Sequence, residues 1–448
     1  MIDMYKSMYK ALLIGLALLM VASYVPQGEK GKAYANSATG SFNILSYNVG
    51  GLPWGLSSSD PASNTPLISP KLNAYDIVNV QEDFNYHAAL YANANHAYKT
   101  ATSGGAGIGS GLNTLSIFPM TNLKRITWND RYGLIDNGSD QLTPKGFTAT
   151  RHRLAEGVFI DVYNLHADAG TDSGSMAARA SNIRQLYNYI VQHSEGNAVI
   201  VFGDTNTRYT REKPLLDEML SATGLTDAWV ELVRGGVAPQ LGDALIDQNN
   251  LNSPNHEVVD KIFYRGSAFV DLQATQYRLE DTYFTDSNGA QLSDHYAISA
   301  VFSYTLSDQL SLSDPFGGSG GDAFNQLNHV LERKISSLTL QSGARVDGFS
   351  LGFADGSTLS VGGTANASVL QLDADEYIAS VTLNRAVRNG DHRIFYMQVT
   401  TSKNKQISGG TATADTVTYT APAGWYIAGF HGRAGAELDS LGVIYKRL

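Results

Sequence analysis

Short apolar runs separated by polar or glycine-rich segments recur through the first two thirds of the chain. The clearest runs have the length and composition of β-strands and cover residues 42–47, 77–81, 159–165, 198–202, 258–264 and 297–304. One segment between them has a helical pattern, because Ile183, Leu186, Tyr187, Ile190 and Val191 recur at the spacing of one helix face. Strands that alternate with a helix predict a layered α/β domain.

The pattern changes near residues 306–321, where Ser313 to Gly321 is rich in glycine and other turn-forming residues. Beyond this segment, apolar runs at 335–340, 348–353, 378–383, 395–400 and 425–430 alternate with turn signals, without a competing helical period. The last third therefore predicts an all-β module. We expect one domain over residues 36–305, a linker over 306–315 and a second domain over 316–448.

The first 35 residues have the features of an export signal. Lys6 and Lys10 precede the apolar run Ala11 to Ser23, and Ala33-Tyr34-Ala35 offers small residues to a signal peptidase. An uncleaved membrane anchor is the alternative, although the run is short for a span. We expect a signal peptide over residues 1–35 and a secreted protein.

Composition limits the chemistry that the chain can perform. Its 448 residues are too many for one ordinary domain, and they include no Cys, which excludes disulfides, a thiolate nucleophile and Cys-ligated zinc. The net charge of −10 disfavours binding to nucleic acid, because such binding depends on Lys and Arg at the phosphates. A nuclease with a locally basic cleft stays open if Arg125, Arg131, Arg151 and Arg153 cluster.

Acids, amides and histidines fall where the predicted strands end or begin. They are Asn48, Glu82, His166, Asp168, Asp204, Asn206, Asp260, Asp294 and His295. In an α/β sheet, ligands bind at the carboxyl ends of the strands. Taken singly, an Asp-x-Asn or an Asp-His pair is more often a turn or a cap. The set as a whole predicts an active site.

Such a set suits the hydrolysis of a phosphate ester. Mg²⁺ takes oxygen ligands, usually one or two carboxylates with water and substrate phosphate, so Glu82 is the candidate ligand, assisted by Asn48. A water must then be activated, and His295 is the candidate general base, with Asp260 fixing its tautomer.

The remaining candidate catalytic residues have supporting roles in this hypothesis. Asp204 and Asn206 would orient the water and the phosphate oxygens. His166 would donate a hydrogen bond to the developing oxyanion or help to protonate the leaving group. Asp294, next to His295, completes the candidate set.

The order of these motifs resembles the endonuclease/exonuclease/phosphatase superfamily, also called the deoxyribonuclease I-like fold, over residues 41 to about 304. The matching stretches are residues 44–48, 80–82, 111–119, 164–166, 203–206, 259–262 and 293–295. The resemblance implies a four-layer α/β sandwich of two central β-sheets flanked by helices. It also implies Mg²⁺-dependent hydrolysis by a nuclease, an inositol-phosphate phosphatase or a sphingomyelinase.

Three details resemble the neutral sphingomyelinase branch: Lys145-Gly146-Phe147, His166-Ala167-Asp168 and the aromatic pair Tyr283-Phe284. In that branch an exposed aromatic hairpin inserts into membranes, so Tyr283 and Phe284 are candidates for peripheral membrane contact. The alternative is that both are core residues of a strand. Pro144 departs from the branch, which often has Asn at this position.

The last third resembles jacalin-related lectins from about Phe316, over residues 320–324, 335–340, 346–349 and 429–439. The resemblance implies a β-prism of three four-stranded sheets, in which a Gly-x-x-x-Asp loop and a glycine surround one sugar. Here the loop is Gly435, Ala436, Glu437, Leu438 and Asp439, and the glycine is Gly321. A β-prism that packs without binding sugar is the alternative.

The favoured hypothesis is a secreted phosphodiesterase that acts on a phospholipid and binds glycans through its lectin domain. A secreted nuclease of the same fold, a phosphatase of inositol or sugar phosphates, and an inert enzyme-like binding protein are the alternatives.

Overall fold

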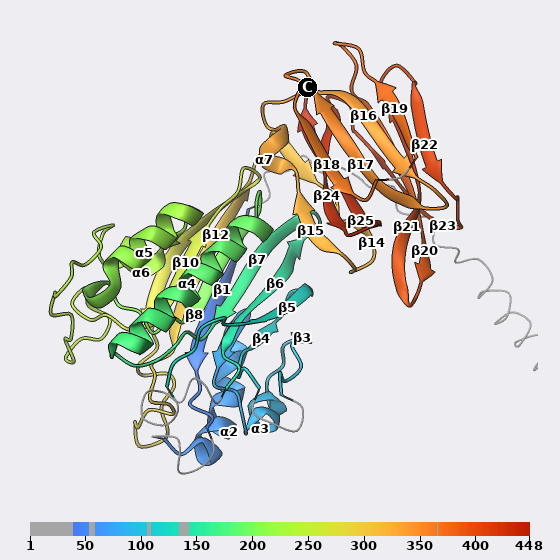
Figure 1. Cartoon of the computed structure of the whole chain (residues 1–448). Coiled ribbons are helices and arrows are strands. Elements are labelled where there is room, and N and C mark those ends of the chain that lie inside the picture. The colour runs from blue at the N-terminus through green and yellow to red at the C-terminus, as the bar shows by residue number, and fades with distance from the viewer. Residues whose placement is uncertain (1–38, 53–58, 105–108, 134–142, 365) are drawn as a thin grey trace, which may run out of the picture.

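The computed structural model describes residues 39–52, 59–104, 109–133, 143–364 and 366–448 (Figure 1). The predicted signal peptide, residues 1–35, lies outside the described residues. Within those ranges, none of the helices is long and apolar enough to cross a membrane.

The first domain contains two six-stranded sheets. The first has the order β11 (Val270–Leu279), β12 (Ile298–Leu306), β1 (Thr39–Asn48), β2 (Ile77–Gln81), β4 (Asn113–Ser116) and β3 (Tyr98–Lys99). The second has the order β5 (Met120–Thr127), β6 (Gly146–Ala155), β7 (Val158–Leu165), β8 (Ala198–Asp204), β10 (Asp260–Arg265) and β9 (Thr226–Asp227). All six predicted strands are present, and the predicted helix is part of α4 (Ser173–His193).

Helices cover the outer faces of both sheets, and this gives the four-layer sandwich that was predicted (Figure 1). On the first sheet, α2 (Pro61–Lys71) packs Ile68 among buried residues of β1 and β2; the turn Leu72–Ala74 and α3 (His87–Ala92) follow on that side. On the second sheet, α4 packs with α5 (Tyr209–Thr223) and α6 (Ala228–Leu232) over β7 and β8. Of these helices, α4 and α5 each bury an apolar stripe against the sheet face.

The two sheets meet through an apolar layer that also contains buried polar side chains. Ile44 and Ile77 of the first sheet belong to the same buried cluster as Ile160 of the second. The amide of Asn79 donates to the backbone oxygens of Tyr163 and Phe202, at 3.2 and 3.1 Å, and so links one sheet to the other. Because a buried amide is costly without partners, these bonds fix how the sheets are aligned.

The second domain consists of three groups of β-strands with one short helix, α7 (Leu327–Val330). The first group is β13 (Leu310–Leu312) and β14 (Phe316–Gly317) on β25 (Leu438–Arg447), then β24 (Trp425–Ala434) and β15 (Asp322–Asn325). The second is β23 (Asp415–Thr420), β20 (Ile378–Arg388), β21 (Asp391–Thr401) and β22 (Gln406–Gly410), joined to the first by one residue pair, Ile378 with Ile427. The third is β18 (Thr358–Gly362), β17 (Val346–Phe353), β16 (Ile335–Ser342) and β19 (Ala367–Gln371). This arrangement is the predicted all-β prism, and β13 lies within the segment predicted as a linker.

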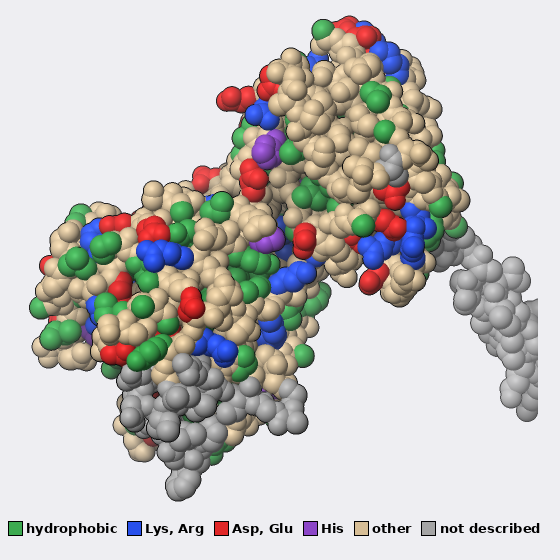
Figure 2. Space-filling model, in the orientation of Figure 1, with side chains coloured by type: hydrophobic (Ala, Val, Ile, Leu, Met, Phe, Trp, Pro, Cys, Tyr) green, Lys and Arg blue, Asp and Glu red, His purple; other side chains and the backbone are tan. Residues whose placement is uncertain are grey.

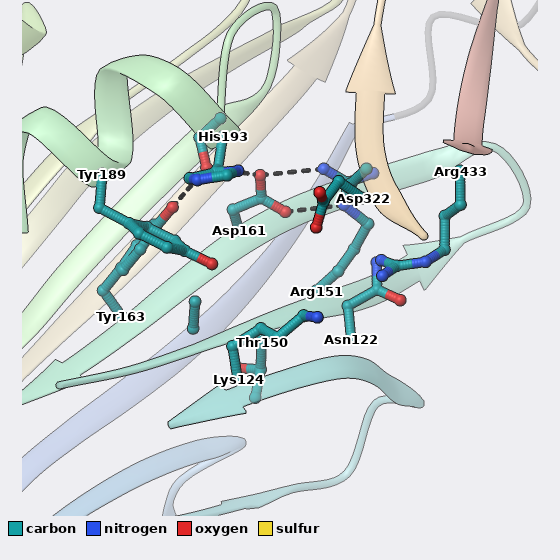
Figure 3. Close-up of a pocket in the computed structure, with 13 residues that line it drawn as sticks. Asn122, Lys124, Thr150, Arg151, Asp161, Tyr163, Tyr189, His193, Asp322 and Arg433 are labelled. Carbon is teal, nitrogen blue, oxygen red and sulfur yellow. Dashed lines mark hydrogen bonds and ion pairs between the residues drawn. The ribbon is translucent and has the colours of Figure 1, made fainter. Parts of the chain in front are cut away.

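Polar contacts join the two domains near the end of β6 and directly before β8. Arg153 forms an ion pair with Asp314 at 2.6 Å, and the amide of Asn325 donates to the side chain of Asn197 at 2.8 Å. Figure 3 shows the adjacent junction, where Asp322 and Arg433 of the second domain reach towards the ion pair of Arg151 with Asp161. Figure 1 shows β1 running away from the second domain, so residues after β1 lie at the opposite end of the sandwich.

Candidate functional site

The strand order brings the predicted residues of the first domain to one end of the two sheets. β1 and β2 are parallel neighbours, with Asn48 opposite Gln81, so Asn48 and Glu82 leave the sheet side by side. On the facing sheet, β8 ends at Asp204, which pairs with Asp260 at the start of the antiparallel β10. His166 forms a bridge to Asp204 directly after β7.

Two of these residues have a left-handed backbone conformation. Glu82 has a φ of 57° and Asn206 has a φ of 51°. Such a conformation is costly for residues other than glycine and is concentrated at functional sites. Gly51 allows the chain to pass close to this turn, since its backbone N–H donates to the Glu82 carbonyl oxygen at 3.1 Å.

Asn48 connects the two sheets through its side chain. Its amide nitrogen lies 3.2 Å from Glu82 Oε1 and 3.1 Å from Asp204 Oδ2, and its oxygen accepts a hydrogen bond from the backbone of Gly50 at 3.1 Å. The amide therefore presents its donor end to both carboxylates. In this arrangement Asn48 orients Glu82, and its role as a metal ligand stays a prediction.

His295 is held between two carboxylates. Its Nδ1 lies 2.9 Å from Asp260 Oδ2, and its Nε2 lies 3.8 Å from Asp204 Oδ2. Burial opposes the charged form, but the carboxylates of Asp260 and Asp204 outweigh burial and hold the pKa of His295 well above its usual value. The contact with Asp260 assigns the proton to Nδ1 and leaves Nε2 facing the cluster.

His166 and Asp204 form the buried centre of the site. His166 Nε2 lies 3.3 Å from Asp204 Oδ2, and the His166 side chain is 2% exposed. Burial, together with the positive charges of Lys145 and His295, holds the pKa of His166 well below its usual value. Burial also raises the pKa of Asp204, although His295 opposes this shift. Asn206 completes the turn, with its backbone N–H 3.0 Å from Asp204 Oδ1.

In the second domain, the loop from Gly435 to Asp439 contains two carboxylates held by arginines. Glu437 pairs with Arg345 at 2.7 Å and with Arg388 at 2.8 Å. Asp439 is fully buried and pairs through Oδ1 with Arg393. Leu438 points into the core, and the backbone N–H of Gly435 donates to the Glu437 carbonyl oxygen at 3.0 Å.

Comparison with known proteins assigns both domains. Residues 64–244 match the Endonuclease/Exonuclease/phosphatase family 2, and residues 313–444 match the Jacalin-like lectin domain. The chain thus carries one domain that matches each family model. The first is called the phosphoesterase-family domain below, and the second the lectin-family domain.

Individual proteins are similar to one domain or the other. The sphingomyelinase of Mycobacterium bovis is 38% identical over 283 residues, which are 61% of this chain and 55% of the relative. The chain thus spans about half the length of the curated sphingomyelinase that it matches. Horcolin of Hordeum vulgare is 29% identical over 135 residues, 29% of this chain and 91% of horcolin. A crystal structure of beta toxin from Staphylococcus aureus aligns with a TM-score of 0.41 at 18% identity, covering 58% of this chain and 99% of that chain.

The phosphoesterase superfamily depends on divalent cations, and the residues at the strand ends fit one. The side chain of Glu82 is 18% exposed, and burial raises the pKa of its carboxyl group although Lys145 and Asn48 oppose this shift. A nearby cation would stabilise this carboxylate, and a hard ion takes oxygen ligands. Asp204, Asp260 and His295 also place one ligand atom each within 4.8 Å of one another. Since the contact between Asp260 and His295 already uses two of those atoms, Glu82 is the better candidate ligand.

The structure contradicts membrane contact by Phe284 and favours the alternative that it is a core residue. Phe284 is fully buried and packs on Tyr47, with ring centroids 4.6 Å apart, so it cannot contact a membrane. Tyr283 is 38% exposed and packs against Phe284. Of the arginines considered for a nuclease cleft, Arg151 and Arg153 form ion pairs at the domain junction instead.

Lys145 is the residue whose importance the sequence did not reveal. It is 5% exposed, and its charge lowers the pKa of Glu82, Asp204 and His166 alike. A buried lysine near several active-site groups provides positive charge for a phosphate. The run Lys145-Gly146-Phe147, at the start of β6, was the available signal. Asp294, in contrast, lies exposed beside His295.

Proposed function

We propose that the phosphoesterase-family domain hydrolyses a phosphodiester of a phospholipid, as a sphingomyelinase does, with Mg²⁺ as cofactor. The observation that carries the proposal is His295, held between Asp260 and Asp204 with Nε2 facing the cluster, beside the pair of Glu82 and Asn48. The 38% identity to a curated sphingomyelinase supports the choice of substrate class.

Glu82 would hold the cation, with Asn48 keeping its carboxylate in place through the 3.2 Å hydrogen bond. When bound, Mg²⁺ polarises a phosphoryl oxygen and offsets negative charge on the leaving oxygen. Lys145, which is buried next to this carboxylate, would add positive charge for the phosphate.

His295 would act as the general base from its uncharged form, in which Nε2 carries no proton. Because its pKa is raised, this form is populated at a higher pH than for an ordinary histidine. A water placed against Nε2 gives up its proton there as its oxygen attacks phosphorus, and the bond between phosphorus and the ester oxygen breaks. Asp260 holds Nδ1 protonated and stabilises the charged ring, and Asp204 with Asn206 orients the water. The neutral His166 would donate a hydrogen bond towards the phosphoryl oxygens when Asp204 shifts to the water.

The lectin-family domain would bind saccharides at Gly321 and the loop from Gly435 to Asp439. Its role would be to retain the secreted enzyme on glycosylated surfaces that also contain the lipid substrate. The division into a signal peptide, a catalytic domain, a linker and a lectin domain at the predicted bounds is part of this proposal.

A nuclease is the less favoured alternative, since the net charge is −10 and both Arg151 and Arg153 are paired with acids. A phosphatase of inositol or sugar phosphates would use the same residues, so only the choice of substrate separates it from the proposal.

The test is release of phosphocholine from sphingomyelin vesicles by the purified chain, with Mg²⁺ or with EDTA. His295→Ala should abolish release, and the matched control His329→Ala, a partly exposed histidine at the domain junction, should leave release unchanged. Full activity of folded His295→Ala would refute the mechanism. If sphingomyelin is not cleaved while duplex DNA or an inositol phosphate is, an alternative substrate replaces the lipid.

A further inference from the structure

The carbohydrate-binding loop is closed by the protein's own arginines. Asp439, the carboxylate that the lectin family would use for sugar hydroxyls, is fully buried and paired with Arg393. Gly320 and Gly321 pack directly on this carboxylate, and a Cβ atom at either position would overlap it. A sugar therefore cannot reach Asp439 until Arg393 moves.

The second oxygen of Asp439 is ready for a ligand. Oδ2 is buried, and no donor among the described residues reaches it. A buried carboxylate oxygen without a hydrogen bond is rare in a protein interior. It indicates an acceptor that is available to a ligand. The backbone around it is fixed, since Arg433 donates to the carbonyl oxygens of Gly320 and Gly321, at 2.8 Å for Gly320.

The surroundings of the loop are basic although the whole chain is acidic. Arg345 and Arg388 share Glu437, and Arg393 takes Asp439, so three guanidinium groups face two carboxylates. Figure 2 shows Lys and Arg side chains gathered beside acidic ones over β20 and β21, the strands that carry Arg388 and Arg393.

We propose that this loop selects saccharides that carry an anionic group, a carboxylate or a sulfate, and that Arg393 is the residue that determines this specificity. The inference rests on the proposed carbohydrate binding. An acidic ligand replaces Asp439 as the partner of Arg393, and the released carboxylate accepts the ligand's hydroxyl groups. A neutral sugar offers Arg393 only uncharged acceptors, and hydrogen bonds of that kind are weaker. A neutral ligand that displaced Arg393 would leave both Arg393 and Asp439 without a charged partner, whereas an acidic ligand leaves only Asp439 without one.

The test compares saccharides that differ only in charge, with the full chain. Methyl β-glucuronide and methyl β-glucoside differ at one carbon, and an array adds matched pairs of galactose with galacturonic acid and with sulfated galactose. We expect the acidic member to bind at least about tenfold more tightly, a preference that added salt reduces. Arg393→Gln should reduce the preference to less than about threefold by strengthening binding of the neutral sugar.

Controls separate specificity from folding. Arg333→Gln removes an exposed arginine of the same domain, paired with Asp355, and should leave the preference unchanged. Arg393→Lys keeps the positive charge and should keep the preference for the acidic saccharide. If Arg393→Gln does not fold, loss of the preference in folded Arg393→Lys would contradict the proposal. Wild-type protein that binds the neutral sugar as tightly as the acidic one would overturn the inference and leave the lectin function intact. Protein that binds no saccharide on the array would overturn both.

Discussion

His152 makes the stability of the phosphoesterase-family domain sensitive to acid. Its ring is fully buried between the two sheets, where Nδ1 lies 3.1 Å from Ser116 Oγ of β4 and Nε2 lies 3.0 Å from Thr150 Oγ1 of its own strand. Burial lowers the pKa of His152 from 6.5 to about 3, although the charge of Asp161 opposes this shift. The ring is therefore neutral in the folded protein throughout the mildly acidic range.

The sign and size of the effect follow from proton linkage. Below pH 6.5 the unfolded chain binds a proton at His152 that the folded chain cannot accept, so stability falls as the pH falls towards the folded pKa. Well below pH 6.5, each pH unit costs about 1.4 kcal/mol, and His152 alone lowers the free energy of unfolding by about 2.3 kcal/mol between pH 6.5 and 4.5. Above about pH 7.5 the stability no longer depends on this group.

His152→Gln supplies a donor and an acceptor that do not titrate. We expect the loss of unfolding free energy between pH 6.5 and 4.5, measured by urea unfolding, to be about 2.3 kcal/mol smaller in this variant than in the wild type. His431→Gln is the matched control in the lectin-family domain, because burial lowers the pKa of His431 to about 4. It should change the pH dependence of the second domain, and that of the first only through its ring contact with Phe159. An identical pH dependence of the first domain in wild type and His152→Gln would refute the reasoning.

Three further predictions concern the active site and its surroundings. Glu82→Gln should reduce phosphocholine release by roughly 10³-fold and remove the increase in Tm that Mg²⁺ causes, measured by vesicle hydrolysis and thermal unfolding. Asp260→Asn should lower kcat by roughly 10²-fold to 10⁴-fold. It should also move the acidic limb of the kcat/KM profile to lower pH, because the pKa of His295 falls when the carboxylate beside it is lost. An acidic limb that does not move would contradict the assignment of His295 as the general base. Phe284→Ala should lower the free energy of unfolding by about 3–5 kcal/mol through the cavity it leaves, without weakening vesicle binding by the folded protein. Weaker binding at unchanged stability would instead favour a membrane role.

The sequence predicted strands well where hydrophobic pattern and burial agree. Residues 77–81 were predicted and form β2, because every residue of this strand is buried. The predicted strand 258–264 starts two residues too early, because β10 begins at Asp260. Val258 and Val259 favour a strand by residue type, but they precede the pairing with β8. Helix α2 was missed because Pro66 and Pro70 lie inside it, which argues against a helix in sequence alone.

The placement of the active site was also predictable, but its internal bonding was not. Polar residues directly after strands had to meet at one end of the sheets. Their hydrogen bonds depend on how two sheets are aligned, as between Asn48 and Asp204, which are 156 positions apart. The run Lys145-Gly146-Phe147 resembles a family motif, but it does not show that the charge of Lys145 would reach Glu82. The sequence likewise cannot tell whether Phe284 is a buried core residue or an exposed hairpin residue, because this depends on its packing against Tyr47.

The position of the lectin-family domain restricts what its ligand can do in the proposed function. Residues near the start of β1 pair with the last residues of β12, after which the chain enters the second domain. Asn48 lies at the other end of β1, and a strand of 10 residues spans about 30 Å. The Gly435–Asp439 loop therefore cannot complete the phosphoester site from this position. A surface saccharide bound there would hold the enzyme at that surface while the opposite end of the sandwich acts on a different molecule. Vesicles that carry the saccharide should therefore be hydrolysed faster than vesicles without it, and hydrolysis of soluble substrates should not change.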